Sequence, residues 1–290
     1  MGEFAYRRPQ TLAECAALLR EDGAKALAGG TDLVPQLREG RRQARTVVDL
    51  KRVQELTALE RTSDGGWRIG GAVSVRALGA NAAFAGEHAA LLASARLIGS
   101  LQVQSRATLA GNLCNAAPSA DGVPLLLALD ATCDIAGQAG RRTLAAAEVA
   151  TGPGRNALAP GELLEAIVLP PRPARTAARY LRFTPRREMD IAIAGSGVRV
   201  DLDGDGRIAK ANIVLASVAP VPLRATRASA CLLGERPSST LFEDAATIAA
   251  SEATPISDTR GSADYRRDLV AVLTRRALAD CARELGVNLQ

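Results

Sequence analysis

The stretch that decides the fold is Thr108–Ala131, TLAGNLCNAAPSADGVPLLLALDA. Its first half carries a glycine and short amide and hydroxyl side chains, which suit a cofactor with many hydrogen-bonding groups. Its second half is an apolar run that predicts a helix over 123–129, with Pro124 in the first turn. A structural interpretation stays open, in which Asn112 serves a turn and Asp121 caps the helix. The stretch therefore predicts a polar loop that runs into a buried helix.

A second glycine-bearing segment, Ala28–Leu33 (AGGTDL), lies earlier in the chain. We expect it between a short buried strand, Lys25–Ala28, and a short helix, Leu33–Leu37. Two adjacent glycines let the backbone turn sharply and present their N–H groups, so such a turn is a natural cradle for phosphate or diphosphate. A plain glycine turn would have the same spacing, and the pattern alone leaves both interpretations open.

The remaining elements predict a mixed α and β protein. Before residue 169 we expect helices over 11–20, with Thr11 as N-cap, and 89–101, and strands over 45–50 and 67–73. The proline-rich run Leu169–Ala177 can continue neither a helix nor a central strand, and we take it as a domain boundary. After it we expect an antiparallel sheet covered by helices, with strands over 179–183, 197–201 and 208–218 and helices over 225–233, 241–251 and 263–285.

Composition excludes several classes of function. The chain has 290 residues, 47% of them hydrophobic, which suits one large domain or two. His88 is the single histidine, so a zinc hydrolase lacks its imidazoles and a serine triad would depend on this residue alone. The eight aromatic residues are scattered, whereas single-stranded nucleic acid is bound by rows of stacking rings. We expect neither a resident metal nor a nucleic-acid partner.

The net charge of +5 comes from an arginine-rich surface. Only Lys25, Lys51 and Lys210 are lysines among the 36 basic residues, so 33 are arginines. Most alternate with acids, which is typical of a solvated surface. One denser run stands out as a candidate for function: Arg179, Arg182, Arg186 and Arg187.

The five cysteines lie far apart and have neither metal-ligand spacing nor a disulfide framework, which favours a reducing compartment. No secretory signal is visible near the N-terminus, and no apolar run is long enough to span a membrane. We expect a cytoplasmic protein. Asp201–Ile208 partly matches a calcium loop, but Asn212 stands where a bidentate glutamate belongs. A hairpin turn explains the match better.

Taken together, these motifs resemble one family, the FAD-binding medium subunits of molybdenum hydroxylases of the xanthine dehydrogenase and carbon monoxide dehydrogenase type. The similarity rests on AGGTDL and the Thr108–Ala131 stretch. It continues through Gly161–Pro170 (GELLEAIVLP), Arg182–Ala192 (RFTPRREMDIA) and Pro255–Arg266 (PISDTRGSADYR). The landmarks occur in the family's order and cover nearly the whole chain.

The resemblance implies an α+β protein. A two-lobed FAD-binding domain of the p-cresol methylhydroxylase and vanillyl-alcohol oxidase type is expected over 1–172, and a small α+β domain over 176–290. It implies that Leu27–Asp32 wrap the diphosphate, that Leu164 is an apolar contact to the flavin, and that Arg182 takes the place of a flavin-facing lysine. A cation there would stabilise reduced flavin, although an exposed strand arginine is equally consistent. The full set of expected FAD-binding residues is Leu27, Ala28, Gly29, Gly30, Thr31, Asp32, Thr108, Gly111, Asn112, Asn115, Asp121, Leu164 and Arg182.

The implied function is electron transfer, with no catalytic residue of the chain's own. Electrons would pass from iron–sulfur clusters of a small [2Fe-2S] subunit, beside a large molybdopterin subunit, through FAD to an acceptor such as NAD+ or a quinone. A dimer of such heterotrimers is expected. A stand-alone flavin oxidoreductase and a non-catalytic flavin-binding module are the alternatives. Ala110 departs from the family's glycine, which would shift or crowd a backbone contact there, and Cys114 is expected to be an apolar filler.

Overall fold

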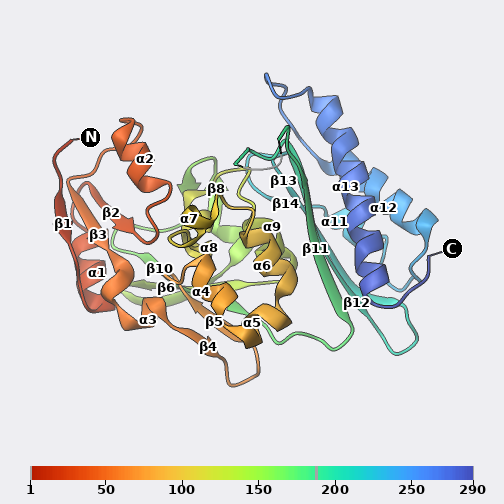
Figure 1. Cartoon of the computed structure of the whole chain (residues 1–290), viewed down its shortest axis with the longest axis horizontal. Helices are drawn as coiled ribbons and strands as arrows, with labels where there is room; N and C mark the ends of the chain where they lie inside the picture. Colours follow the sequence, from red (N-terminus) through yellow and green to blue (C-terminus); the bar gives the residue numbers. More distant parts are fainter. Residues whose placement is uncertain (1, 187–188, 290) are drawn as a thin grey trace. The chain divides into compact units, whose positions relative to one another are not determined.

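The computed structural model describes residues 2–186 and 189–289, which form two compact units (Figure 1). The first unit runs to Gly86 and also contains Gly99–Ala116 and Ala131–Pro171. The second contains Glu87–Ile98, Ala117–Asp130 and the chain from Arg172 onward. The decisive stretch 108–131 is therefore divided, with its part up to Ala116 in the first unit and the next part in the second.

The first unit begins with a small lobe built on a parallel sheet. Its strands, in spatial order, are β1 (Ala5–Arg7), β3 (Thr46–Asp49) and β2 (Ala24–Leu27). Helix α1 (Leu12–Leu19) is capped by the Thr11 side chain, which accepts a hydrogen bond from the N–H of Glu14. Helix α2 (Leu33–Arg38) follows the glycine loop after β2. The helices and strands predicted up to residue 50 are confirmed, apart from shifts at their ends.

The larger lobe of the first unit is an antiparallel sheet. Its strands, in spatial order, are β4 (Leu59–Arg61), β5 (Trp67–Gly70), β10 (Leu163–Leu169), β6 (Thr132–Gly137) and β7 (Gly140–Ala145), with a separate pair β8 (Ala150–Gly152) and β9 (Arg155–Asn156). Short helical turns join them: η1 (Leu50–Arg52), α3 (Gln54–Thr57), α4 (Val75–Ala80), α5 (Ala82–Glu87) and α10 (Ala146–Val149). Helix α1 contacts strands of both sheets, so it joins the two lobes.

Two sequence predictions were wrong in this part of the chain. The single helix expected over 89–101 is broken into α6 (Ala89–Ala95) and α7 (Leu101–Gln104). The break follows from Gly99, which has a left-handed φ of 58°, and from Ser100, whose side chain caps α7. The polar segment expected as a loop contains helix α8 (Leu109–Asn115), capped by the Thr108 side chain. Its glycine and amide residues therefore lie on a helix.

The second unit is an antiparallel sheet with helices. The strands, in spatial order, are β11 (Thr176–Phe183), β12 (Ala194–Leu202), β13 (Ile208–Ala216) and β14 (Leu223–Arg224). The C-terminal helices are α11 (Thr226–Ala230), α12 (Ser239–Glu252) and α13 (Ala263–Glu284). The predicted α+β arrangement is confirmed. Between β12 and β13, Asp203 Oδ1 accepts hydrogen bonds from the N–H groups of Asp205 and Arg207, so the segment resembling a calcium loop is a hairpin turn.

Helices cover both faces of this sheet (Figure 1). Helices α6 and α9 (Val123–Ala128) belong to the same unit and pack against its strands. The Ser196 hydroxyl accepts a hydrogen bond from the Thr274 hydroxyl of α13, while a Cβ on Gly197 would lie 2.9 Å from Pro124 of α9. Neighbouring residues of a strand point to opposite faces, so α13 and α9 lie on opposite sides of β12. All nine residues of β12 are buried as a result.

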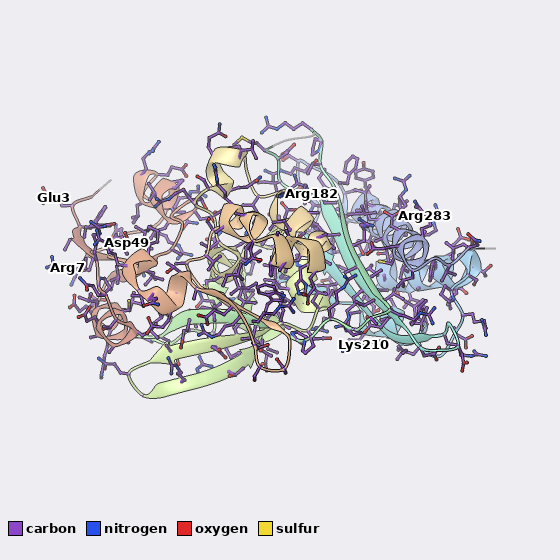
Figure 2. All side chains as sticks on the ribbon, turned by 60° about the horizontal axis from the view of Figure 1, so that its bottom comes forward. Glu3, Arg7, Asp49, Arg182, Lys210 and Arg283 are labelled. Carbon is purple, nitrogen blue, oxygen red and sulfur yellow. The ribbon has the colours of Figure 1, made fainter. Side chains whose placement is uncertain are left out.

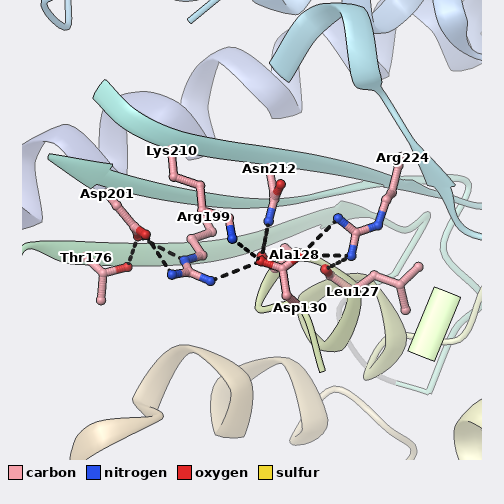
Figure 3. A network of polar contacts seen from close by, with 9 residues as sticks. All are labelled: Leu127, Ala128, Asp130, Thr176, Arg199, Asp201, Lys210, Asn212 and Arg224. Atoms are coloured by element: carbon pink, nitrogen blue, oxygen red, sulfur yellow. Dashed lines mark hydrogen bonds and ion pairs between the residues drawn. The ribbon is translucent and has the colours of Figure 1, made fainter. Parts of the chain in front are cut away.

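A network of charged groups joins α9 to the sheet (Figure 3). Asp130, after the helix, pairs with three cations: Arg199 (3.3 Å), Lys210 (2.7 Å) and Arg224 (3.1 Å). Asp201 takes the opposite side of the Arg199 guanidinium at 2.6 Å. Burial opposes the ionisation of Asp130, yet Lys210 and Arg224 hold the pKa of its carboxyl below the usual value. One carboxylate therefore fixes the end of α9 to strands β12, β13 and β14.

We expect Asp130→Ala to lower the free energy of unfolding of the chain by about 2–3 kcal/mol, since it leaves three cations without this partner while Asp130 is itself partly exposed. Urea-induced unfolding measures the effect. Asp264→Ala is the matched control, because the Asp264–Arg267 pair of α13 is exposed and is worth less than about 1 kcal/mol. Equal losses in the two variants would show that the Asp130 network has no special weight.

Candidate functional site

The glycine loop after β2 has its carbonyl groups occupied by protein donors. Four of its oxygens accept hydrogen bonds: Ala28 from Lys51 Nζ (2.9 Å), Gly29 from Arg106 Nε (3.4 Å), Gly30 from the Val34 N–H (3.0 Å) and Asp32 from the Gln36 N–H (3.1 Å). In the part of the chain that the structure describes, the N–H groups of residues 29–32 donate to no protein acceptor. The loop therefore presents the positive ends of its peptide dipoles, which suits an anion such as a diphosphate.

Both glycines of the loop are required by its geometry. A Cβ on Gly29 would lie 2.1 Å from the carbonyl oxygen of Arg106 and 3.1 Å from the Ala107 Cα, so the loop packs directly on that backbone. Gly30 has a φ of 79°, in the left-handed region that side chains disfavour. The close approach at Gly29 brings the loop beside the residues that precede Thr108.

The first part of the second motif, Thr108–Asn115, therefore lies next to the glycine loop in the same unit. The Thr108 hydroxyl accepts a hydrogen bond from the Gly111 N–H at 2.9 Å and so caps α8. The side-chain oxygen Oδ1 of Asn115 accepts a hydrogen bond from Nε2 of Gln36 on α2 at 3.1 Å. Asn112 lies on the same helix, and Ala110 is buried in its first turn. The structure brings together the residues predicted over 27–32 and 108–115.

Leu164 is buried on β10, in the unit that holds residues 27–32 and 108–115. The pairing of β10 with β6 shifts its register between Leu164 and Ala166, so Glu165 lies at an irregularity of the strand. The buried Glu165 carboxylate is held by Arg68 (2.7 Å) and Arg141 (2.8 Å). This pair of arginines around Glu165 was not predicted, because Arg68 and Arg141 are distant from Glu165 in the chain.

The two remaining predicted residues, Asp121 and Arg182, belong to the second unit and form an ion pair. Asp121 also accepts a hydrogen bond from the Tyr180 hydroxyl at 3.0 Å. Only 8% of the Arg182 side chain is exposed, so it is not an exposed strand arginine. Burial raises the pKa of Asp121 to about 6, although Arg182 and Tyr180 oppose that shift. Tyr180 was missed, but its place two residues before Arg182 on one strand face was a usable signal.

Other residues singled out in the sequence have structural roles. Arg179 pairs with Glu284 and Arg186 with Asp190, while Arg187 lies outside the described residues. Burial raises the pKa of the Cys114 thiol to about 12, so the thiol is protonated at neutral pH. His88 is buried at the start of α6. Among residues 2–186 and 189–289, no group of three or more potential metal ligands gathers. No helix within those ranges combines the length and apolar character needed to cross a membrane.

The fold combines a small parallel lobe with a glycine loop suited to an anion, a larger antiparallel lobe and an α+β unit. This combination defines the class of two-lobed FAD-binding proteins. Residues 2–172 match the family model of the FAD binding domain in molybdopterin dehydrogenase. Residues 179–281 match the CO dehydrogenase flavoprotein C-terminal domain. The chain therefore belongs to the family of FAD-binding medium subunits of xanthine and carbon monoxide dehydrogenases, which are oxidoreductases of the molybdenum hydroxylase type.

Individual relatives match along nearly their whole length. The carbon monoxide dehydrogenase medium chain of Afipia carboxidovorans is 32% identical, over 96% of both chains. A xanthine dehydrogenase FAD-binding subunit of Escherichia coli is 30% identical, over all of both chains. The solved structure of reconstituted CO dehydrogenase from Oligotropha carboxidovorans superposes with a TM-score of 0.92 at 30% identity, covering 97% of this chain and 98% of that one. The predicted family, fold class and FAD cofactor are confirmed.

Proposed function

We propose that this chain is the electron-transfer subunit of a molybdenum-containing hydroxylase. It would receive electrons from iron–sulfur clusters of a partner and pass them through FAD to an external acceptor such as NAD+ or a quinone. Bound FAD supplies the redox chemistry, and the chain's own residues bind, orient and shield it. No residue of the chain is proposed as a catalytic acid or base.

The observation that carries this proposal is the polarity of the glycine loop. The carbonyls of Ala28, Gly29, Gly30 and Asp32 are occupied, whereas the N–H groups of residues 29–32 meet no protein acceptor within the described ranges. A diphosphate needs donors and repels carbonyl oxygens, so it fits this arrangement. We propose that Leu27–Asp32 hold the FAD diphosphate.

We propose contacts to FAD for the other predicted residues as well. Thr108, Gly111, Asn112, Asn115 and Asp121 would contact the adenosine diphosphate side and ribityl chain, with Leu164 an apolar contact to the flavin. Arg182 would lie at the flavin with its charge balanced by Asp121. We propose an FAD-binding domain over 1–172 and a C-terminal domain over 176–290. The matched family models, over 2–172 and 179–281, support this division.

We propose that the chain assembles with a small [2Fe-2S] subunit and a large molybdopterin subunit as a dimer of heterotrimers in the cytoplasm. Support comes from relatives that are named medium chains or medium subunits, such as the nicotine 6-hydroxylase medium subunit of Paenarthrobacter nicotinovorans. The absence of clustered cysteines in the sequence fits metal centres that lie on other chains.

The purified full chain is expected to take up one FAD and to show the absorption bands of oxidised flavin. When the tagged chain is purified from its host, a molybdenum-containing chain and an iron–sulfur chain should co-purify with it. Protein that stays colourless after added FAD would contradict the proposal. Turnover by the isolated chain would identify a self-sufficient enzyme, and flavin binding with neither turnover nor partners would identify a binding module.

A further inference from the structure

Lys51 fixes the first peptide group of the glycine loop. Its ammonium donates to the carbonyl oxygen of Ala28 at 2.9 Å and also pairs with the Asp49 carboxylate. Lys51 lies on η1, directly after β3, and its side chain is largely buried. The lysine therefore joins the central strand of the parallel lobe to the loop that follows β2.

Asp49 anchors this lysine. It is the last residue of β3, is only 4% exposed and lies in the small lobe (Figure 2). The Tyr6 hydroxyl of β1 donates to its carboxylate, and the Lys51 N–H does so at 3.1 Å. Burial disfavours its charge, yet the hydrogen bonds from Lys51 and Tyr6 hold the pKa of Asp49 below its usual value. The hydrogen bond to Asp49 in turn raises the pKa of Tyr6.

All three strands of the parallel sheet contribute to this network, which lies at the carboxyl ends of the strands. Tyr6 comes from β1, Asp49 from the end of β3 and Ala28 from the residue after β2, and the register pairs Leu27 with Asp49. Ligands of open α/β sheets bind outside the carboxyl ends of parallel strands, where the loops diverge. The network therefore lies at the same end of the sheet as the glycine loop.

A hydrogen bond that fixes the Ala28 carbonyl also fixes the direction of the Gly29 N–H. The Ala28 carbonyl and the Gly29 N–H belong to one planar trans peptide group and point in opposite directions. Since Lys51 takes the oxygen, the Gly29 N–H points away from Lys51. A cation on the oxygen also polarises the peptide group and strengthens its N–H as a donor.

We propose that Lys51, anchored by Asp49 and Tyr6, is a positioning residue that orients and polarises the Gly29 N–H toward the FAD diphosphate. This inference rests on the proposed placement of the diphosphate at Leu27–Asp32. Lysine suits the role because its compact ammonium divides its donors between a carboxylate and a carbonyl, whereas the planar arginine fork favours bidentate pairing. The chain retains only three lysines beside 33 arginines, and this is one of them.

The test compares ligands with and without a diphosphate on the flavin-free full chain. Lys51→Met should weaken FAD and ADP binding by about 10- to 100-fold, the cost of losing one charge-assisted hydrogen bond, and leave riboflavin binding unchanged. Calorimetry with ADP and flavin fluorescence quenching provide the affinities. Lys25→Met is the matched control: Lys25 lies on β2, and no hydrogen bond or ion pair of its side chain is found among the described residues.

Two outcomes would overturn the inference: unchanged ADP affinity in Lys51→Met, or equal losses for ADP and riboflavin, which indicate a general structural defect. If the variant fails to fold because Asp49 is left buried and unpaired, Asp49→Asn/Lys51→Met is compared with Asp49→Asn alone. Gly29→Val separates the two proposals. If it abolishes ADP binding while Lys51→Met does not, only the role of Lys51 fails; if neither affects ADP, the proposed loop site fails as well.

Discussion

Gly29→Val is expected to reduce FAD affinity by at least about 100-fold. The reason is the backbone contact, since a Cβ would lie 2.1 Å from the Arg106 carbonyl oxygen, a distance that real Cβ atoms do not show. The loop must move away from the α8 segment, and its N–H groups lose their arrangement. Binding is measured by flavin fluorescence quenching on the full chain.

Gly30→Ala, at the neighbouring glycine, should reduce FAD affinity less than Gly29→Val does. A Cβ on Gly30 would meet the movable Leu27 side chain at 2.8 Å, so Gly30→Ala adds mainly the left-handed backbone cost of about 1–2 kcal/mol. Gly86→Ala is the control, because a Cβ there has nothing within 4 Å. Wild-type FAD affinity in Gly29→Val would remove the loop from the site.

Arg182→Met is expected to lower the free energy of unfolding by about 3–5 kcal/mol at pH 8, because it leaves the Asp121 carboxylate buried without its cation. Burial already raises the pKa of Asp121 to about 6 in the native chain. A raised native pKa means that this group's stabilising contribution is complete below its unfolded pKa of about 3.9 and is lost as pH rises to about 6. In the variant, which lacks the opposing charge of Arg182, this loss of stability continues to higher pH. Urea unfolding at pH 5 and pH 8 should therefore show the larger deficit at pH 8.

Two further variants test the cause of that loss. Asp121→Asn/Arg182→Met removes both charges and should recover part of the stability at pH 8. Arg179→Met, on the same strand, breaks a more exposed pair with Glu284 and should cost no more than about 1 kcal/mol. A deficit of Arg182→Met that is the same at both pH values and persists in the double variant would contradict a role for the buried charge.

The local pattern of the sequence was sufficient for most elements of the small lobe, although strand β1 was not predicted. Thr11 capping α1, the strand before the two glycines and the β-branched strand β3 all formed as predicted, because capping and glycine punctuation act within a few residues. The helix over 89–101 was mispredicted, since its alanines and leucines masked the break made by Gly99 and Ser100. Strands β6, β7 and β10 were also missed; for β10 the reason is that its partners, β5 and β6, are remote in sequence.

The sequence by itself determined the family, the FAD cofactor and the glycine loop, because a close backbone approach to an anion tolerates few residue types and leaves a readable order of motifs. Only the tertiary structure decided how charges are used. In β12, Arg199 and Asp201 alternate with apolar residues and would pass for solvent-facing, yet α9 covers them and Asp130 pairs with Arg199. Arg182 meets Asp121, and Lys51 meets Ala28, for the same reason: ion pairs and carbonyl contacts depend on distances in space that spacing along the chain does not encode.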